Sequence, residues 1–381
     1  MLEILFLLLP LAFYSGWRTA YKRNKDTQAE TREVSTRFVR GINFLLNEDP
    51  DKALDIFLEA PAIDAQTAET FLTLGKMFRN RGEVNRALRL HQHLVARPDL
   101  SNTQRQAAML ALGEDFFAAG LLDRAESVFR ELITTYPKNT QACVPLRHIY
   151  EQLQEWDKAI ELAACSVEGK VERNRLVAHY WCEQATEHLQ KNQLFQVDEA
   201  LKKASASDPE LARIQVLKAE LALARDDRPA ALKHFRQAIQ HDQRLLGSLV
   251  QRLLDVFKQP VELQQIQAFV NAEYTRNRDP RLFPPLLAIA HQNGEGQTLL
   301  PLVHTHLQQE AVTLQTVARS AAVLADSMPL AMRPPLDELG QALNRLVKLQ
   351  PRFQCTRCGY KMHDYLWRCP ACHQWDTIQH T

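Results

Sequence analysis

Apolar and polar positions between residues 36 and 245 follow a helical pattern that recurs every 34 to 38 residues. In every repeat but the fourth, which has Arg147, a small residue stands twelve positions before an alanine or valine, and in the first four an aromatic residue lies between the two positions. The repeats place this first position at Gly41, Gly75, Gly113, Arg147, Ala185 and Ala219. Such a period predicts antiparallel helix pairs that cannot bury their apolar faces alone and therefore stack into a superhelical solenoid.

The residues of the pattern have separate packing roles. We expect the small residue to allow close approach of two helices, and the alanine to lie where the second helix crosses the first. A large apolar residue four positions further on fills the remaining space (Phe57, Phe129, Phe235), and prolines end the second helix (Pro98, Pro137, Pro209). GINFLLNEDPDKAL, GKMFRNRGEVNRAL and GEDFFAAGLLDRAE carry a resemblance to the tetratricopeptide repeat, about six of which would fill residues 36–245.

Residues 246–350 remain helical in composition, but the repeat pattern weakens. Ala288 and Leu300 keep the twelve-residue spacing, while prolines interrupt the helices. We predict two or three degenerate repeats here. The predicted fold class is therefore all-α, with a small terminal domain at residues 351–381.

Residues 2–17 are apolar except for Glu3, with Pro10, Ser15 and Gly16 tolerated, and basic residues follow at Arg18, Lys22, Arg23 and Lys25. A secretory signal has the reverse charge order and a small-residue cleavage site, neither of which is present. About 20 apolar residues suffice to cross a bilayer, so residues 1–20 predict a transmembrane anchor, with an interfacial helix as the alternative. The positive-inside rule places the N-terminus outside and the basic linker, residues 21–35, with all that follows in the cytoplasm.

Composition excludes some functions. Lysine and arginine total 46 against 45 aspartates and glutamates, a net charge of +1, which gives no electrostatic reason to expect nucleic-acid binding. The sequence has no phosphate-cradling glycine loop, HExxH, Gly-x-Ser-x-Gly or dinucleotide fingerprint. His304 and His306 are two residues apart, so on a helix they face different directions. We therefore do not expect an enzyme.

A solenoid of this kind binds peptides, helices or domains on its concave face. Counting along the first helices of the repeats gives a candidate partner surface, for which ordinary solvated polar residues are the alternative interpretation. Its members are Lys76, Arg79, Asn80, Glu114, His148 and Glu151.

The strongest chemical signal is the segment CTRCGYKMHDYLWRCPACHQW. It contains two Cys-x-x-Cys pairs, Cys355 with Cys358 and Cys369 with Cys372, separated by ten residues. Each tight turn presents two thiolates, and the spacer allows the turns to face each other, which predicts a tetrahedral four-sulfur metal site. Gly359 supplies a position that favours positive φ. Disulfides are the alternative, but they do not suit the reducing cytoplasm.

This segment is too short to fold without its metal. Four thiolates leave no open coordination position, so the site is expected to be structural, and His363 and His373 are not expected to be ligands. Five aromatic residues cover the sulfurs or dock the segment onto the last helices: Phe353, Tyr360, Tyr365, Trp367 and Trp375. The knuckles resemble those of rubredoxin, in which the metal is iron; zinc ribbons share them. We interpret the remaining cysteines, Cys143, Cys165 and Cys182, as buried small hydrophobes.

The combination of MLEILFLLLPLAFYSGW, the repeats and the terminal CTRCGY…WRCPACHQW resembles the bacterial lipopolysaccharide assembly protein B family. The resemblance implies metal ligation by Cys355, Cys358, Cys369 and Cys372, with iron favoured over zinc. It also implies an adaptor in the bacterial inner membrane, with a periplasmic N-terminus and a cytoplasmic bulk. Its implied partners are an FtsH-type membrane protease, whose degradation of an LpxC-type lipid A deacetylase it promotes, and lipopolysaccharide assembly proteins.

Two other functions stay open at this point. One is a general scaffold for envelope assembly with no link to proteolysis. The other is a redox protein that uses rubredoxin-type iron, although the ten-residue spacer is shorter than in free-standing rubredoxins.

Overall fold

The computed structural model describes residues 17–18, 40–41, 43–44, 50–58, 65–166, 169–277, 282–308 and 312–380. The predicted anchor and linker, residues 1–20 and 21–35, lie outside this part of the chain except for Trp17 and Arg18. Among the described helices, none is both long and apolar enough to cross a bilayer. The chain divides into two compact units, residues 1–168 and 169–381.

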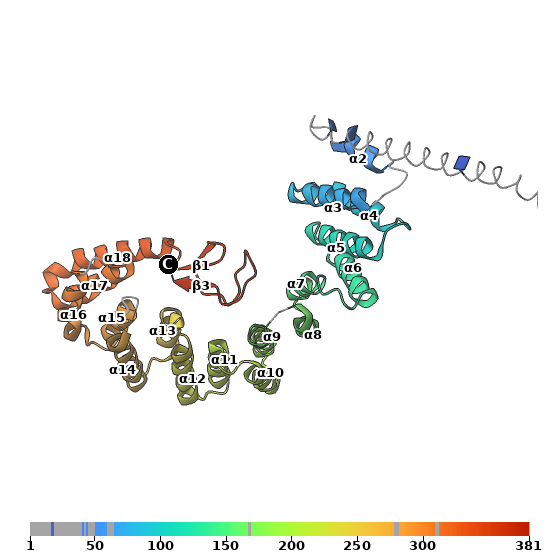
Figure 1. Ribbon diagram of the computed structural model, residues 1–381. Coiled ribbons are helices and arrows are strands. Elements are labelled where there is room, and N and C mark those ends of the chain that lie inside the picture. Colours follow the sequence, from blue (N-terminus) through green and yellow to red (C-terminus); the bar gives the residue numbers. More distant parts are fainter. Residues whose placement is uncertain are drawn as a thin grey trace, which may run out of the picture. The chain divides into compact units, whose positions relative to one another are not determined.

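Unit 1 is built of helical hairpins, coloured blue to green in Figure 1. Its helices are α2 (Pro50–Leu58), α3 (Ala65–Asn80), α4 (Val84–Val95), α5 (Asn102–Ala118), α6 (Leu122–Thr135), α7 (Cys143–Leu153) and α8 (Trp156–Ser166). The pairs α3/α4, α5/α6 and α7/α8 pack together, and each pair packs on the next. Helix α4 ends before Pro98 and α6 before Pro137, as predicted.

Unit 2 continues with further helices and ends in a small sheet. Its α-helices are α9 (Lys170–Gln190), α10 (Leu194–Ser207), α11 (Ala212–Ala224), α12 (Arg228–His241), α13 (Leu246–Val256), α14 (Pro260–Asn277), α15 (Phe283–Gln292), α16 (Leu300–Leu307), α17 (Leu314–Ser327) and α18 (Arg333–Leu349). Short 3-10 turns are η1 (Gln243–Leu245), η3 (Gly296–Leu299) and η4 (Leu330–Met332). The strands are β1 (Phe353–Cys355), β2 (Lys361–Met362) and β3 (Ile378–His380), in the antiparallel order β2-β1-β3.

Each hairpin turn has the same backbone conformation. A residue with positive φ follows the first helix of the pair, at Gly82, Gly120, Gln154, Asn192 and Asp226. These positions are 38, 34, 38 and 34 residues apart, which matches the period of the sequence pattern. The next residue's N–H donates to a carbonyl five residues earlier, as in Glu83 to Phe78 and Leu121 to Phe116. The same closure recurs from Glu295 to Ala290, so this hairpin geometry continues beyond residue 245.

The predicted roles of the small residues are visible in the packing. A Cβ atom added to Gly75 would lie 2.2 Å from the His91 ring, and one added to Gly113 would lie 2.4 Å from the Phe129 ring. The alanines at the crossing points, Ala87 and Ala125 among them, are fully buried. The close approach of paired helices therefore depends on the missing side chain.

We predict that Gly113→Ala lowers the free energy of unfolding by about 1–3 kcal/mol, because the new methyl group would overlap the Phe129 ring. Gly340→Ala is the matched control, since its nearest neighbour, the Ala321 Cβ, lies at 3.5 Å. That change should raise stability by up to about 1 kcal/mol through helix propensity alone. Urea denaturation of both variants measures the difference, and equal effects would contradict the role given to Gly113.

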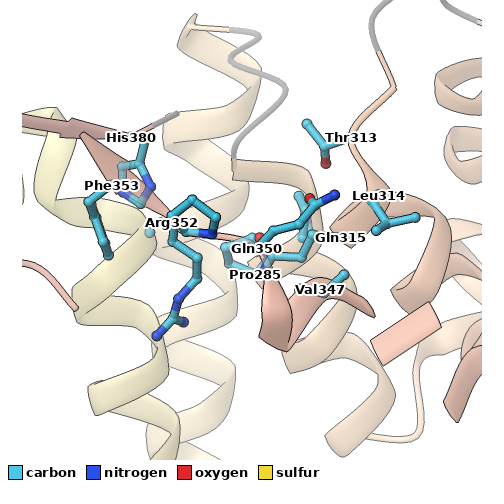
Figure 2. Close-up of a pocket in the computed structure, with 12 residues that line it drawn as sticks. Pro285, Thr313, Leu314, Gln315, Val347, Gln350, Arg352, Phe353 and His380 are labelled. Atoms are coloured by element: carbon cyan, nitrogen blue, oxygen red, sulfur yellow. The ribbon is translucent and has the colours of Figure 1, made fainter. Parts of the chain in front are cut away.

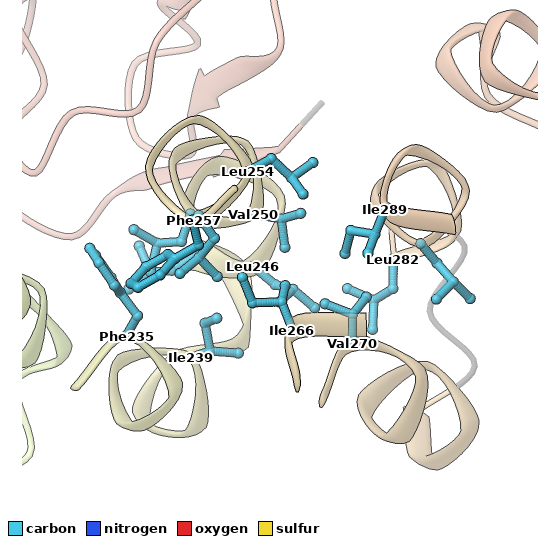
Figure 3. Packing of buried hydrophobic residues seen from close by; sticks show 14 of the residues in the cluster. Phe235, Ile239, Leu246, Val250, Leu254, Phe257, Ile266, Val270, Leu282 and Ile289 are labelled. Atoms are coloured by element: carbon cyan, nitrogen blue, oxygen red, sulfur yellow. The ribbon is translucent and has the colours of Figure 1, made fainter. Parts of the chain in front are cut away.

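The largest buried cluster lies in the middle of unit 2. Figure 3 shows Phe235 and Ile239 of α12 facing Leu246 and Val250 of α13, with Ile266 of α14 beyond them. Tyr365 and Trp367 also pack against this cluster from the end of the chain. The core of the helices is therefore continuous with the terminal sheet.

One expectation about the cysteines is wrong. Cys143 and Cys165 form a disulfide bond with a Cα–Cα separation of 6.0 Å, and Cys165 is exposed rather than buried. The antiparallel pairing of α7 and α8 brings the start of the first helix beside the end of the second. A reducing compartment would keep this pair as thiols. Cys182 is buried as expected, and burial raises the pKa of its thiol to about 12.

Candidate metal centre

The four cysteines of the two knuckles converge on one point. Their sulfur atoms all lie within 4.8 Å of one another. The sulfurs of Cys355 and Cys372 are 3.7 Å apart, as are those of Cys358 and Cys369. Because a metal–sulfur bond is about 2.3 Å long, a regular tetrahedron of thiolates has edges of about 3.8 Å. The observed separations fit that tetrahedron and exclude a disulfide bond between these sulfurs.

The two knuckles use matching backbone turns. Gly359 has φ +76° and its N–H donates to the Cys355 carbonyl at 2.9 Å, as its position after the second cysteine predicted. His373 holds the equivalent position in the second knuckle, with φ +56° and an N–H bond to the Cys369 carbonyl at 2.9 Å. The potential ligand group contains neither His363 nor His373. His373 thus has a backbone role that the sequence did not reveal.

The electrostatics of the four thiols favour a bound cation. Burial raises the pKa of Cys355, but the Thr377 hydroxyl and the N–H groups of Cys358 and Arg357 outweigh it and bring the pKa to about 6. Burial and the neighbouring sulfurs raise the pKa of Cys372 to about 12. Four thiolates at this spacing repel one another unless a positive ion lies among them. The donor set therefore fits a divalent or trivalent metal ion that would be held by all four cysteines.

We call residues 351–380 the terminal module. Most of its aromatic residues connect it to the helices. Phe353 is 2% exposed and lies in the module's own core, with Met362 and Ile378. Tyr365 and Trp367 pack on the helical cluster, whereas Tyr360 is 47% exposed. In Figure 1 the strands lie on the inner side of the arc formed by the helices of unit 2.

Trp375 is the centre of the contact with α9 and α11. Its ring stacks on His179 with centroids 4.6 Å apart and meets the Tyr180 ring edge-on at 6.1 Å. The Arg213 guanidinium lies 5.6 Å from the Trp375 ring and 5.8 Å from the Trp367 ring. These stacking and cation–π contacts are energetically significant when they are shielded from water. We call His179, Tyr180, Arg213 and Arg175 the docking surface.

A partly buried ion pair accompanies this stacking. The Asp376 carboxylate accepts bonds from Arg175 Nε at 2.6 Å and from His179 Nε2 at 2.9 Å. Although burial opposes it, hydrogen bonding to His179 and the charge of Arg175 lower the pKa of Asp376 to about 2. Burial lowers the pKa of His179, so its neutral ring donates through Nε2. The chain brings together groups about 200 residues apart.

Asp376→Asn should destabilise the docked module by about 2 kcal/mol at pH 7. The folded pKa of Asp376 is below its usual 3.8, so its contribution is complete above pH 3.8 and is lost as the pH falls through about 2. Asp364→Asn is the matched control, because Asp364 is 86% exposed and should contribute little. Thermal unfolding at pH 7 compares them, and an equal shift in both would refute the role of Asp376.

The predicted partner surface in unit 1 is only partly available to a partner. Lys76 and Asn80 are exposed. Arg79 forms ion pairs with Glu114 and with the buried Asp115, each at 2.5 Å. Asp115 in turn contacts the buried His91, so this network joins α3, α4 and α5.

The fourth repeat contains a similar internal network. Glu151 is buried and pairs with Arg147, and His148 lies 3.1 Å from it. Sequence counting thus selected residues of the first helices of the repeats, but several of them are involved in packing between helices. The residues of the docking surface were missed, since Arg213 is one of three charged residues in its helix and does not stand out in the sequence.

The described residues define the class of protein. It is a helical-repeat protein, with hairpins at a 34- to 38-residue period, that carries a docked rubredoxin-type module with four cysteines. Residues 353–380 match the family model described as rubredoxin metal binding domain. The chain is 33% identical to lipopolysaccharide assembly protein B of Escherichia coli K12 over 386 residues, covering all of this chain and 98% of that protein. It therefore belongs to the lipopolysaccharide assembly protein B family.

Other comparisons are more distant. The Haemophilus influenzae lipopolysaccharide assembly protein B is 29% identical, with 100% of this chain and 98% of that protein covered. Among solved structures, a MamA crystal structure aligns with 48% of this chain and 95% of its own, at 16% identity and a TM-score of 0.34.

Proposed function

We propose that this protein is an inner-membrane adaptor that regulates lipopolysaccharide synthesis. In this proposal it presents an LpxC-type lipid A deacetylase to an FtsH-type protease and has no catalytic activity of its own. The observation that carries the proposal is full-length membership of a family named for lipopolysaccharide assembly, with all four metal ligands in place. The metal would be structural, because four thiolates fill a tetrahedral site.

The proposed location follows from the apolar N-terminal segment. Residues 1–20 would cross the inner membrane with a periplasmic N-terminus, and the basic residues after Trp17 would hold the remainder in the cytoplasm. A cytoplasmic position also keeps the cysteines of the module reduced and able to bind metal.

The adaptor role needs surfaces that proteins can bind. Lys76 and Asn80 lie one turn apart on the exposed side of α3, and they are the members of the predicted surface that internal ion pairs leave accessible. The docked module adds a second composite surface, because its position on α9 and α11 is fixed by Trp375 and Asp376.

Photo-crosslinking in living cells tests this assignment. A photoreactive residue at Lys76 or Asn80 should capture the deacetylase or the protease, whereas one at Lys202, exposed on α10, should not. Capture of lipopolysaccharide assembly proteins alone would favour the general scaffold, a role that the name of the Escherichia coli relative, lipopolysaccharide assembly protein B, supports.

The identity of the metal bears on the redox alternative. We propose iron, on the resemblance of the knuckles to rubredoxin; the matching family model supports a metal site without distinguishing iron from zinc. Iron bound by four thiolates is coloured and reversibly reducible. A colourless zinc protein with full cellular function would contradict the iron assignment and exclude a redox role.

A further inference from the structure

A cationic hollow lies where the terminal module meets the last two helices. It has a volume of about 410 Å³, in the range of small-ligand sites. Its polar lining comes from α17, α18 and the module: Gln315, Arg319, Asn344, Lys348, Arg352 and His363. Its wall contains no carboxylate. Apart from Val347, the three parts of the chain therefore place basic and neutral polar groups around one space.

These cations are poorly neutralised by the protein. In the described part of the chain, neither Arg319 nor Lys348 forms an ion pair. A terminal nitrogen of Arg352 is 3.5 Å from an Asp364 carboxylate oxygen. Because the Asp364 side chain is 86% exposed, water screens this ion pair and it neutralises Arg352 only weakly. Elsewhere in unit 2, Arg228 and Arg252 each pair closely with a glutamate. Like charges held around one hollow repel one another, and an anion placed among them removes that cost.

A second, smaller hollow of about 130 Å³ shares part of this lining. Gln315, Val347 and Arg352 line both. Figure 2 shows the smaller hollow, where the Arg352 side chain extends away from Leu314 and Pro285. The lining of the smaller hollow is mainly apolar or neutral. A ligand that fits both parts has a charged group and an uncharged organic part.

We infer that this hollow binds the phosphate group of a phosphate monoester. Arg319 supplies a planar fork that matches phosphate oxygens, and Lys348 adds a point charge. Arg352, whose Nε donates to the His363 carbonyl at 3.0 Å, adds its terminal N–H groups. His363 and the side-chain amides of Asn344 and Gln315 complete the donors. Because the lining belongs to both the module and the helices, a bound phosphate bridges them and stabilises the docked arrangement. This site goes beyond the adaptor function and does not depend on it.

Calorimetric titration of the purified full-length protein tests the site. Inorganic phosphate and glucose 6-phosphate should bind, and glucose should not. Combining Arg319→Gln with Lys348→Gln should weaken binding at least about tenfold. Arg345→Gln is the matched control, because Arg345 is exposed on the same helix but does not line the hollow. Circular dichroism and metal content confirm folding, and the exposed Lys348→Gln alone replaces the double variant if that variant is unstable.

A separate measurement distinguishes a soluble phosphate from a lipid headgroup. Dioctanoyl phosphatidic acid is compared with dioctanoyl phosphatidylcholine, which lacks the monoester. Binding of phosphatidic acid alone, dependent on Arg319, identifies a lipid source. If no phosphate probe binds the unmodified protein, or if Arg345→Gln loses as much affinity as the double variant, the inference is wrong. Neither outcome bears on deacetylase turnover, so the adaptor proposal stands or falls separately.

Discussion

Cys355→Ser removes the bound metal and unfolds the terminal module. Serine cannot replace the thiolate, and the three remaining sulfurs cannot complete the tetrahedron that the 3.7 Å separations define. Structural metal binding contributes about 10–16 kcal/mol in comparable small modules, far more than the few strands here provide. We expect the metal content to fall from one ion per chain to nearly none, and cellular function to be lost.

The control is Cys182→Ala, which removes a buried cysteine of α9 that lies outside the metal group. It should keep the full metal content and lose only a small packing contribution. Elemental analysis and protection from proteolysis measure both effects. A Cys355→Ser protein that keeps its metal, or functions normally without it, would contradict the structural role of the site.

Trp375→Ala should separate the module from the helices while leaving its metal bound. The substitution removes the stacking on His179, the edge contact with Tyr180 and the cation–π contact with Arg213. Large aromatic residues cost about 3–5 kcal/mol when truncated in packed surroundings. Amide hydrogen exchange should therefore increase around His179 in α9, and adaptor function should fall as strongly as in the metal-free variant.

Tyr360→Ala is the matched control for the tryptophan, because Tyr360 is in the same module but is 47% exposed. Exchange in α9 should stay unchanged in that variant. If Trp375→Ala leaves the exchange of α9 unchanged, docking rests on other contacts. If docking is lost but function is kept, the composite surface is not needed by a partner.

Local features of the fold could be predicted because their causes lie within one repeat. Gly113 and Phe129 are sixteen residues apart, and the period alone places them face to face in a helical hairpin. The knuckle turns are equally local, so Gly359 was expected to have positive φ. The positive φ of His373 was not expected, because histidine adopts positive φ much less readily than glycine does.

The docking surface could not be predicted in the same way. The contact of Asp376 with His179 and Arg175 joins positions about 200 residues apart, and nothing in either segment specifies the other. The Cys143–Cys165 bridge was missed because it depends on how α7 and α8 lie beside each other. Glu151 was assigned to a partner surface, although its carboxylate is buried by packing that a helical count does not reveal.

The most direct test of the adaptor proposal is the lifetime of the deacetylase in cells. Pulse labelling would follow the LpxC-type enzyme in cells with the unmodified protein, with none, and with Cys355→Ser. We predict rapid degradation only with the unmodified protein, and a lengthened half-life of similar size in the other two. An unchanged half-life in cells that lack the protein would contradict the proposed control of proteolysis.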